Sequence, residues 1–212
     1  TIVTEPHASR DHSESMMRHF GASVSQDINA DGTHRVTLAG EAELVAKDIL
    51  VPGDPSSAAF VMVAALISAN SDITIPAVGM NPLRTGLITT LKEMGGNIEI
   101  SNERIEGGEK IADIRVRHSK LTGIAVPPER AASMIDEYPV LSVAASVATG
   151  QTVMQGVAEL RVKETDRIKV MADGLAMAGV TVAYDDNSMT VTGGTIKGGV
   201  SIASQHDHRI AM

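Results

Sequence analysis

An internal repeat is the feature that most restricts the folds open to this sequence. Three segments share one pattern, which we interpret as strand, turn, strand and loop, and they end at Asp54, Asp136 and Asp207. After each aspartate an apolar helix is predicted, over residues 55–69, residues 137–150 and from residue 208 onward. Aspartate is favoured at the start of a helix, because its carboxylate accepts hydrogen bonds from free backbone N–H groups. The repeat therefore predicts three equivalent helix starts.

A second helix and the strand after it complete each unit. They are predicted within residues 10–24, 84–100 and 165–184, and each helix closes with a glycine, namely Gly21, Gly95 and Gly179. Short strands that start at Asp72 and Gln151 separate the two helices of a unit. The unit is thus βαβαββ and recurs at about 70 to 85 residues. The first helices are apolar nearly all round, so the sequence predicts an α/β fold of repeated units around buried helices.

Composition excludes several classes of partner. The chain has 212 residues, a formal net charge of −8, two Tyr, two Phe and no Trp, which argues against a nucleic-acid binder. It has no Cys, which excludes a disulfide scaffold and a thiol nucleophile and fits a reducing compartment. The longest apolar run, residues 58–67, is too short to cross a bilayer. We expect a cytoplasmic protein that binds neither nucleic acid nor a membrane.

The densest cluster of charge precedes the last of the second helices. Its members are Arg161, Lys163, Glu164, Asp166 and Arg167. A cationic loop at a helix N-terminus suits an anion, because the free N–H groups and the helix dipole add to the side chains. The same residues also fit a solvated loop whose charges pair with one another, with Glu164 as the helix cap. Both interpretations stay open.

Other candidates are weaker when each is taken alone. Asp136 is either a helix cap or a carboxylate whose basicity is tuned by a half-buried site. His206 and His208 are spaced like metal ligands, but no third ligand follows at regular spacing, so we expect no metal. Arg209 at the same helix start suits an anion, and Arg10 and Arg84 stand in matching places before two of the second helices.

Five strings are together far more specific than any one of them. In order they are VPGDPSSAAF, MNPLRTG, IDEYPVLSVAA, ELRVKETDRI and DHRIAM. They resemble the family of 5-enolpyruvylshikimate-3-phosphate (EPSP) synthases, or 3-phosphoshikimate 1-carboxyvinyltransferases, over essentially the whole chain. MNPLRTG and IDEYP are similar to the bacterial class II of this family, which tolerates glyphosate.

The resemblance implies a fold and a reaction. The family fold is two domains of three βαβαββ units, each packed around buried parallel helices as an inside-out α/β barrel. Its members transfer the enolpyruvyl group of phosphoenolpyruvate to the 5-hydroxyl of shikimate 3-phosphate and release phosphate, on the shikimate pathway to chorismate and the aromatic amino acids. The reaction requires no metal or redox cofactor, and glyphosate is an inhibitor.

The resemblance also implies catalytic residues. Asp136 is similar to the proton acceptor near the 5-hydroxyl, and Glu164 to the acid that handles the proton at the methylene carbon of phosphoenolpyruvate. Lys163 is similar to a residue that contacts both substrates.

Further residues are implied to bind the substrates. Arg167 and Arg209, with His208 beside them, resemble the residues that hold phosphoenolpyruvate. Arg10 resembles a contact to the phosphate of shikimate 3-phosphate. We expect the cations of this set to converge on one cleft, because both substrates are anions.

By the same resemblance, residues 1–50 end one domain, residues 51–54 form a crossover hinge, and residues 55–212 form most of the second domain. The first part of the family's sequence, with further substrate contacts, has no counterpart. We therefore expect a fragment or truncated variant that binds substrates weakly and turns over slowly, if at all.

Two alternatives remain. One is the sister enolpyruvyl transferase that acts on UDP-N-acetylglucosamine, but that enzyme usually carries a loop Cys and this chain has none. The other is a non-catalytic anion-binding or scaffold fragment of the same fold. Binding of shikimate 3-phosphate distinguishes them.

Overall fold

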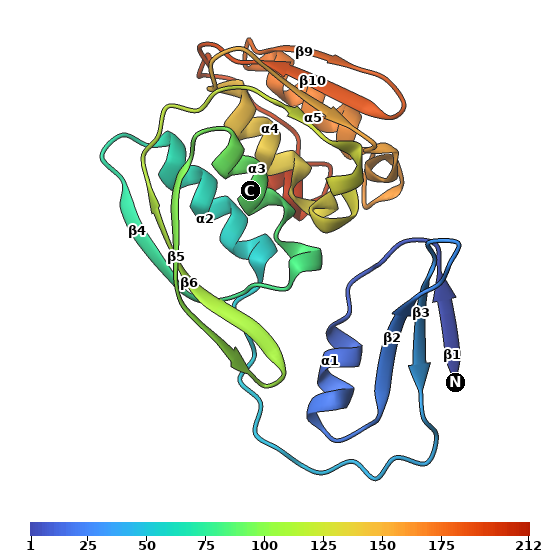
Figure 1. The fold of residues 1–212 in the computed structure, drawn as a ribbon. Helices are drawn as coiled ribbons and strands as arrows, with labels where there is room; N and C mark the ends of the chain where they lie inside the picture. Colours follow the sequence, from blue (N-terminus) through green and yellow to red (C-terminus); the bar gives the residue numbers. More distant parts are fainter.

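Three β-sheets with one strand order organise the chain in the computed structural model, which describes residues 1–212 (Figure 1). The first sheet contains, in spatial order, β1 (Ile2–Glu5), β3 (His34–Leu38) and β2 (Val24–Ile28). The second contains β4 (Asp72–Gly79), β6 (Glu109–Arg117) and β5 (Asn97–Glu106). The third contains β7 (Ala125–Val126), β8 (Gln151–Gln155), β10 (Ser188–Thr192) and β9 (Thr181–Tyr184). Each time the last strand of the unit lies between two antiparallel neighbours, which confirms the predicted repeat.

The second helices end as the sequence predicts. They are α1 (His12–His19), α3 (Gly86–Glu93) and α5 (Arg167–Met177). Beyond each of them the chain turns at Gly21, Gly95 and Gly179, whose φ angles are 101°, 92° and 83°. Only glycine adopts this left-handed region without a penalty, so the three glycines let each helix stop and pass into a strand.

The first helices are α2 (Pro55–Ile67), α4 (Tyr138–Ser146) and the short α6 (His208–Ala211). Asp54 caps α2 by accepting from the N–H groups of Ser56 and Ser57, and Asp207 caps α6 by accepting from the Arg209 N–H. The expectation of a cap at Asp136 is wrong. Asp136 lies in the 3₁₀ turn η3 (Ile135–Glu137), makes no cap hydrogen bond, and turns its carboxylate toward two arginines instead.

The expected strand before each first helix forms only in part. It is reduced to β7, which pairs parallel with β8, and to one parallel bridge between Gly53 and Val78. Residues 193–204 contain no strand. A strand needs a neighbour to satisfy its backbone, so the pattern alone does not produce one.

Helix α4 is shorter than predicted. It ends at Ser146 rather than near Gly150, because the Ser146 carbonyl accepts a hydrogen bond from the Gly194 N–H, 2.9 Å away, instead of continuing the helix. Gly150 still serves as a turn, with a φ of 90°. The boundary is set by the segment after β10, which the local sequence of the helix does not reveal.

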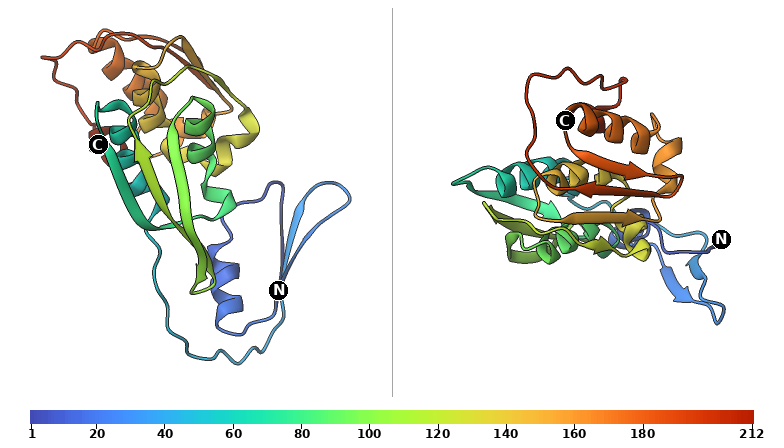
Figure 2. Two further views of the ribbon diagram at one scale, coloured as in Figure 1. Left: turned by 60° about the vertical axis from the view of Figure 1, so that its left-hand side comes forward. Right: turned by 90° about the horizontal axis from the view of Figure 1, so that it is seen from above.

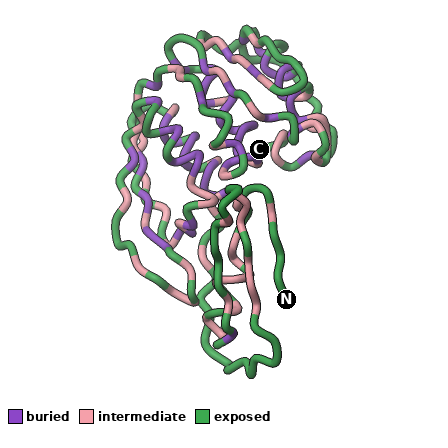
Figure 3. Tube along the Cα trace, turned by 45° about the vertical axis from the view of Figure 1, so that its right-hand side comes forward, coloured by how far each residue is buried: buried purple, intermediate pink, exposed green.

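The first unit, residues 1–50, projects from the larger part of the chain, as the two views of Figure 2 show. The hydrophobic core lies entirely within that larger part (Figure 3). It gathers 34 buried residues between Ala58 and Val191, and α4 is buried along almost its whole length, as predicted from its apolar sequence. Helix α2 is buried on one side, while Val61 on the other is 48% exposed. In residues 1–50 only Ala22 is buried. Burial thus changes at the predicted boundary, and the division into two domains stays a prediction.

Polar contacts join the first unit to the larger part. Three consecutive residues each contact one residue across the gap, in the pairs Arg10–Asp136 (2.7 Å), Asp11–Asn81 (2.6 Å) and His12–Glu109 (2.8 Å). Residues 40–52 run from one part to the other. This segment makes a single backbone–backbone hydrogen bond, from the Val45 N–H to the Phe20 carbonyl of the first unit. The joint therefore rests on a short segment before and within the first turn of α1.

None of the helices, of which α2 is the longest with 13 residues, combines the length and apolar character needed to cross a membrane.

Replacing Gly95 by Ala tests the role of the glycine that ends α3. Space for a methyl group exists, since the nearest atom to a built Cβ is 3.6 Å away, so the cost comes from the φ of 92°. We expect Gly95→Ala to lower the free energy of unfolding in urea by about 1–2 kcal/mol. The control Gly40→Ala, where a Cβ meets nothing within 4 Å, should leave it nearly unchanged. Equal stability of both variants would contradict this.

Candidate active site

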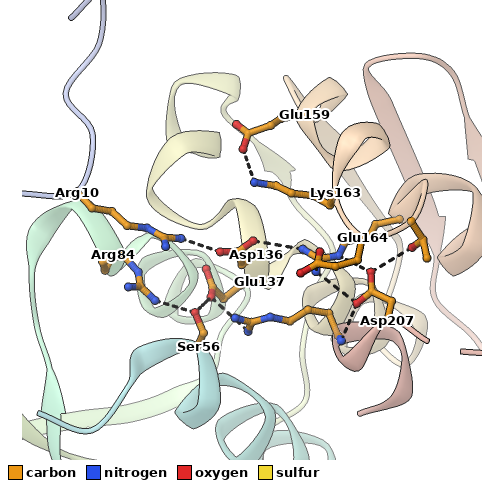
Figure 4. A network of polar contacts seen from close by, with 12 residues as sticks. Arg10, Ser56, Arg84, Asp136, Glu137, Glu159, Lys163, Glu164 and Asp207 are labelled. Carbon is orange, nitrogen blue, oxygen red and sulfur yellow. Dashed lines mark hydrogen bonds and ion pairs between the residues drawn. The ribbon is translucent and has the colours of Figure 1, made fainter. Parts of the chain in front are cut away.

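The buried side chain of Arg167 is the centre of the site. Figure 4 shows the three carboxylates that meet there, of Asp136, Glu164 and Asp207. The Arg167 side chain projects from the start of α5, is 1% exposed, and its Nε donates to Asp207 Oδ2 at 2.8 Å. Its Nη1 donates to Asp136 Oδ1 at 3.2 Å and its Nη2 to Glu164 Oε2 at 2.5 Å. Carboxylates from three separate elements therefore meet on one guanidinium.

Local sequence explains how Glu164 becomes available. The cap of α5 is Asp166, whose carboxylate accepts from the Lys169 N–H at 3.0 Å. The alternative in which Glu164 caps this helix is wrong. Because Glu164 has no part in capping, its carboxylate is free to reach Arg167 while its side chain stays 52% exposed.

Asp136 is the carboxylate of the candidate site that lies between two arginines. Its side chain is 18% exposed, and it accepts from Arg10 at 2.7 Å as well as from Arg167. Burial raises the pKa of Asp136, but the hydrogen bond from Arg10 and the charges of Arg10, Lys163 and Arg209 outweigh burial and hold the pKa below its ordinary value. Asp136 is therefore ionised at neutral pH, and the cations predicted to converge do act on this one group.

The cations at the loop before α5 do not all fit one of the two interpretations, an anion site or a self-paired loop. Arg161 pairs with Asp166 at 2.6 Å, and Lys163 pairs with Glu159, so these two cations follow the self-paired interpretation. Arg167 does not, since it is buried in the carboxylate cluster. Lys163 belongs to both descriptions, because its charge also lowers the pKa of Asp136.

Of the two candidate residues at the start of α6, Arg209 lies at the cluster and His208 does not. The Arg209 guanidinium lies 4.0 Å from Glu137 Oε1 and 5.9 Å from the centre of the Phe60 ring. His208 is exposed and its side chain makes no hydrogen bond or ion pair. The structure thus brings Arg209 to the cluster but does not bring His208 into it.

Sequence reasoning missed a second polar cluster beside the first. Ser56 Oγ donates to Glu137 Oε1 and accepts from Arg84 Nη2 at 2.7 Å, and Arg84 also contacts Asp54 at 3.1 Å. The sequence alone offers Ser56 and Arg84 only as weak, separate candidates. For Glu137, which follows Asp136, no sequence pattern predicts a role. The link from Asp207 to Arg167 was also missed, because it joins residues 40 positions apart.

A cavity of about 530 Å³ lies beside these groups, between the first unit and the turns η2 (Pro128–Ser133), η3 and η4 (Ala158–Val162). Ser9, Ser133, Ile135 and Glu159 are among its lining residues. No Arg or Lys lines the cavity, although Glu159, which pairs with Lys163, does. Its volume is that of a small-molecule pocket.

A family model decides the relationship of this chain to known proteins. The model described as EPSP synthase (3-phosphoshikimate 1-carboxyvinyltransferase) matches residues 1–212. The chain belongs to the EPSP synthase family. This confirms the resemblance inferred from the five sequence strings.

Individual members of the EPSP synthase family agree with the model. The chain is 56% identical over 215 residues to the 3-phosphoshikimate 1-carboxyvinyltransferase of Granulibacter bethesdensis, covering all of this chain and 47% of that protein. It is 54% identical to the enzyme of the same name from Pseudomonas sp. strain PG2982, covering 48% of it. The chain thus spans about half the length of the curated relatives it matches.

Solved structures confirm the fold class. The EPSP synthase of Acinetobacter baumannii superposes with a TM-score of 0.92 at 46% identity, covering all of this chain and 48% of that one. The enolpyruvyl transferase NikO of Streptomyces tendae superposes with a TM-score of 0.63 at 16% identity, over 91% of this chain and 42% of that one, and supports the fold alone. The individual residue roles and the class II assignment stay predictions.

Replacing Asp207 by Asn tests the buried pair. Asp207 is fully buried and Arg167 is 1% exposed, so the variant leaves a buried guanidinium short of a counter-charge. We expect Asp207→Asn to lower the free energy of unfolding in urea by about 3–5 kcal/mol. The matched control is Asp173→Asn, which breaks an exposed pair with Lys169 and should cost less than about 1 kcal/mol. Similar losses in both variants would refute the central role of Arg167.

The same carboxylates predict how stability depends on pH. Arginine partners hold the pKa values of Asp136 and Asp207 below the ordinary value of 3.8, against the opposing effect of burial. Carboxyls with lowered pKa values stabilise the fold fully above pH 3.8 and lose that contribution as the pH falls toward the lowered values. Urea unfolding at a series of acidic pH values should therefore give a steeper loss of stability in the wild type than in Asp207→Asn. Parallel profiles would be the contrary result.

Proposed function

We propose that this chain is part of an enzyme that transfers the enolpyruvyl group of phosphoenolpyruvate to the 5-hydroxyl of shikimate 3-phosphate and releases phosphate. The observation that carries the proposal is the convergence of Asp136 and Glu164 on buried Arg167, from two different elements. The family membership of the whole chain and the names of its relatives support it.

Two carboxylates in unlike environments suit the two proton transfers of this reaction. Asp136 is held ionised, as a group must be that accepts the proton of the 5-hydroxyl while the oxygen attacks C2 of phosphoenolpyruvate. Glu164, more exposed, delivers a proton to the C3 methylene carbon and gives a tetrahedral intermediate. Glu164 then takes a proton back from the new methyl group, the electrons of that C–H bond re-form the enol double bond, and the C–O bond to phosphate breaks as phosphate departs.

Focused cations suit two anionic substrates on a protein whose net charge is negative. Arg10, Lys163 and Arg209 lie around Asp136, and their charges lower its pKa. We assign Arg10 and Lys163 to shikimate 3-phosphate, and Arg167, Arg209 and Lys163 to phosphoenolpyruvate. His208 lies next to Arg209 and reaches the substrate only if its exposed ring turns inward.

The proposal extends to organisation and location. Residues 1–50 belong to one domain, residues 51–54 to the hinge and residues 55–212 to the other domain, in keeping with the change in burial at this point. The active site lies between the two parts, near the contact of Arg10 with Asp136. The protein acts in the cytoplasm, and glyphosate competes for the site of phosphoenolpyruvate.

A non-catalytic fragment that binds anions is the second candidate. One observation favours it: several site cations are paired with carboxylates of the chain itself, Arg167 with three and Lys163 with Glu159. The chain also spans about half the length of its relatives. Under this alternative an anion binds, but phosphate is never released from phosphoenolpyruvate.

Calorimetric titration of shikimate 3-phosphate into the 212-residue chain tests the proposal. We expect weak binding that Lys163→Gln reduces roughly 10- to 100-fold, because a hydrogen bond between charged groups is lost. The matched control is Lys169→Gln. It also removes one positive charge, but on the C-terminal side of Asp166 and from an exposed pair with Asp173. Addition of glyphosate or phosphoenolpyruvate should strengthen the binding.

The outcomes separate the candidates. No heat with shikimate 3-phosphate at any concentration contradicts the proposal, and heat with UDP-N-acetylglucosamine in its place assigns the chain to the sister transferase. Binding without phosphate release over long incubation with both substrates favours the non-catalytic fragment.

A further inference from the structure

Glu137 is a buried carboxylate for which the proposed reaction has no use. It follows Asp136 directly, but its side chain is turned toward the start of α2 rather than toward Arg10 and Arg167 (Figure 4). It is 3% exposed, and its Oε2 has no hydrogen-bond partner although it is buried. An unpaired buried carboxylate oxygen is costly, so its retention at this position requires an explanation.

A row of contacts leads from the hinge to Glu137. Arg84 bridges Asp54, at the end of the hinge, and Ser56, and Ser56 in turn donates to Glu137 Oε1. The other side of the same oxygen faces Arg209, whose Nη1 is 4.0 Å away. Glu137 is therefore fixed on one side and faces a candidate anion-binding cation on the other.

Arg209 differs from Arg167 in how its donors are used. All three guanidinium nitrogens of Arg167 donate to carboxylates. The guanidinium of Arg209 makes no hydrogen bond within the chain, and its two neighbours are Glu137 and the ring of Phe60. The donors of Arg209 are thus available to an anion, and Glu137 is the nearest negative charge with which that anion must compete.

We infer that Glu137 is a positioning residue that holds the Arg209 guanidinium in place and limits how tightly it binds an anion. The inference rests on the proposed function in one respect, namely that Arg209 binds an anion. A bound anion and an ionised Glu137 repel each other across Arg209, so binding of the anion favours the protonated form of Glu137.

The surroundings of Glu137 make such a proton exchange accessible. Burial raises the pKa of Glu137, the charge of Asp136 raises it further, and the hydrogen bond from Ser56 with the charges of Arg84 and Arg209 opposes both. The net result is a raised pKa. An anion that neutralises Arg209 removes one of the charges that lower the pKa of Glu137, and this pKa should then rise further.

Sulfate is the probe for the experiment, because it stays fully ionised over the range in which the carboxyls titrate. We titrate it calorimetrically into the 212-residue chain at about pH 8, where carboxyls are ionised. The variants are Glu137→Gln, Arg209→Gln and the double substitution. The matched control is Glu93→Gln, which removes a carboxylate from a pair with Arg130 elsewhere.

The expected result is that Glu137→Gln binds sulfate roughly three- to tenfold more tightly than the wild type, because one opposing charge is gone. Glu93→Gln should match the wild type. Arg209→Gln should weaken binding, and Glu137→Gln should have no further effect in that background. An effect of Glu137→Gln that persists without Arg209 overturns the inference, and so does an affinity equal to or below the wild type.

A second measurement starts from the wild type, whose result alone can overturn the inference. Titrations of the wild type in two buffers of different ionisation enthalpy, near the carboxyl range, should reveal net proton uptake on sulfate binding. Glu137→Gln should reduce this uptake, whereas a purely structural role for Glu137 would leave it unchanged. The absence of uptake in the wild type overturns the inference.

The design separates two kinds of failure. If wild type and Arg209→Gln bind sulfate equally, Arg209 is not an anion-binding residue, and the inference fails together with that part of the proposed function. If Arg209→Gln loses binding while Glu137→Gln matches the wild type, the inference alone fails.

Discussion

The pairing of buried Arg167 with three carboxylates is the interaction on which the site depends. A guanidinium removed from water is tolerated only when its donors meet acceptors of opposite charge, and Asp207, Asp136 and Glu164 supply them. The three acceptors come from the start of α6, the turn before α4 and the loop before α5. One ion cluster thereby fixes the relative positions of three elements that the repeat brings to the same end of the fold.

The cations around this cluster differ in how many of their hydrogen-bond donors are paired with carboxylates. Arg167 is fully engaged and organises the carboxylates, while Lys163 and Arg10 each pair with one carboxylate. Arg209 alone keeps its donors unbonded. A protein with a net charge of −8 can thus present local positive charge, because its arginines and lysine are focused on one place.

Features fixed by local sequence were predictable, and features fixed by distant contacts were not. The βαβαββ unit, the glycines after the second helices and the caps at Asp54 and Asp207 follow from short-range patterns, and the structure contains them. Asp136 does not cap a helix as Asp54 and Asp207 do. Its carboxylate instead accepts hydrogen bonds from Arg10, 126 positions away, and Arg167, 31 positions away, which are stronger partners than the N–H groups of a helix end. The missing strand over residues 193–204 has the same origin, since a strand depends on a neighbour that the local sequence does not specify.

The candidate site shows the same division. The strings around Lys163 and Asp136 indicated two separate loops, and the structure brings Asp136, Glu164, Arg167 and Arg209 together there. Their roles in a reaction stay predictions. Glu137 was invisible, because nothing in the string IDEYP indicates that its two neighbouring acids face opposite ways.

The joint between the first unit and the rest has a consequence for how the molecule responds to its solvent. Its main contacts come from three neighbouring residues, Arg10, Asp11 and His12, and two of these side chains are more than 40% exposed. Ionic strength weakens exposed charge pairs but hardly affects an apolar core. Dissolved salt therefore weakens the exposed contacts between the two parts more than it weakens the apolar core of the larger part.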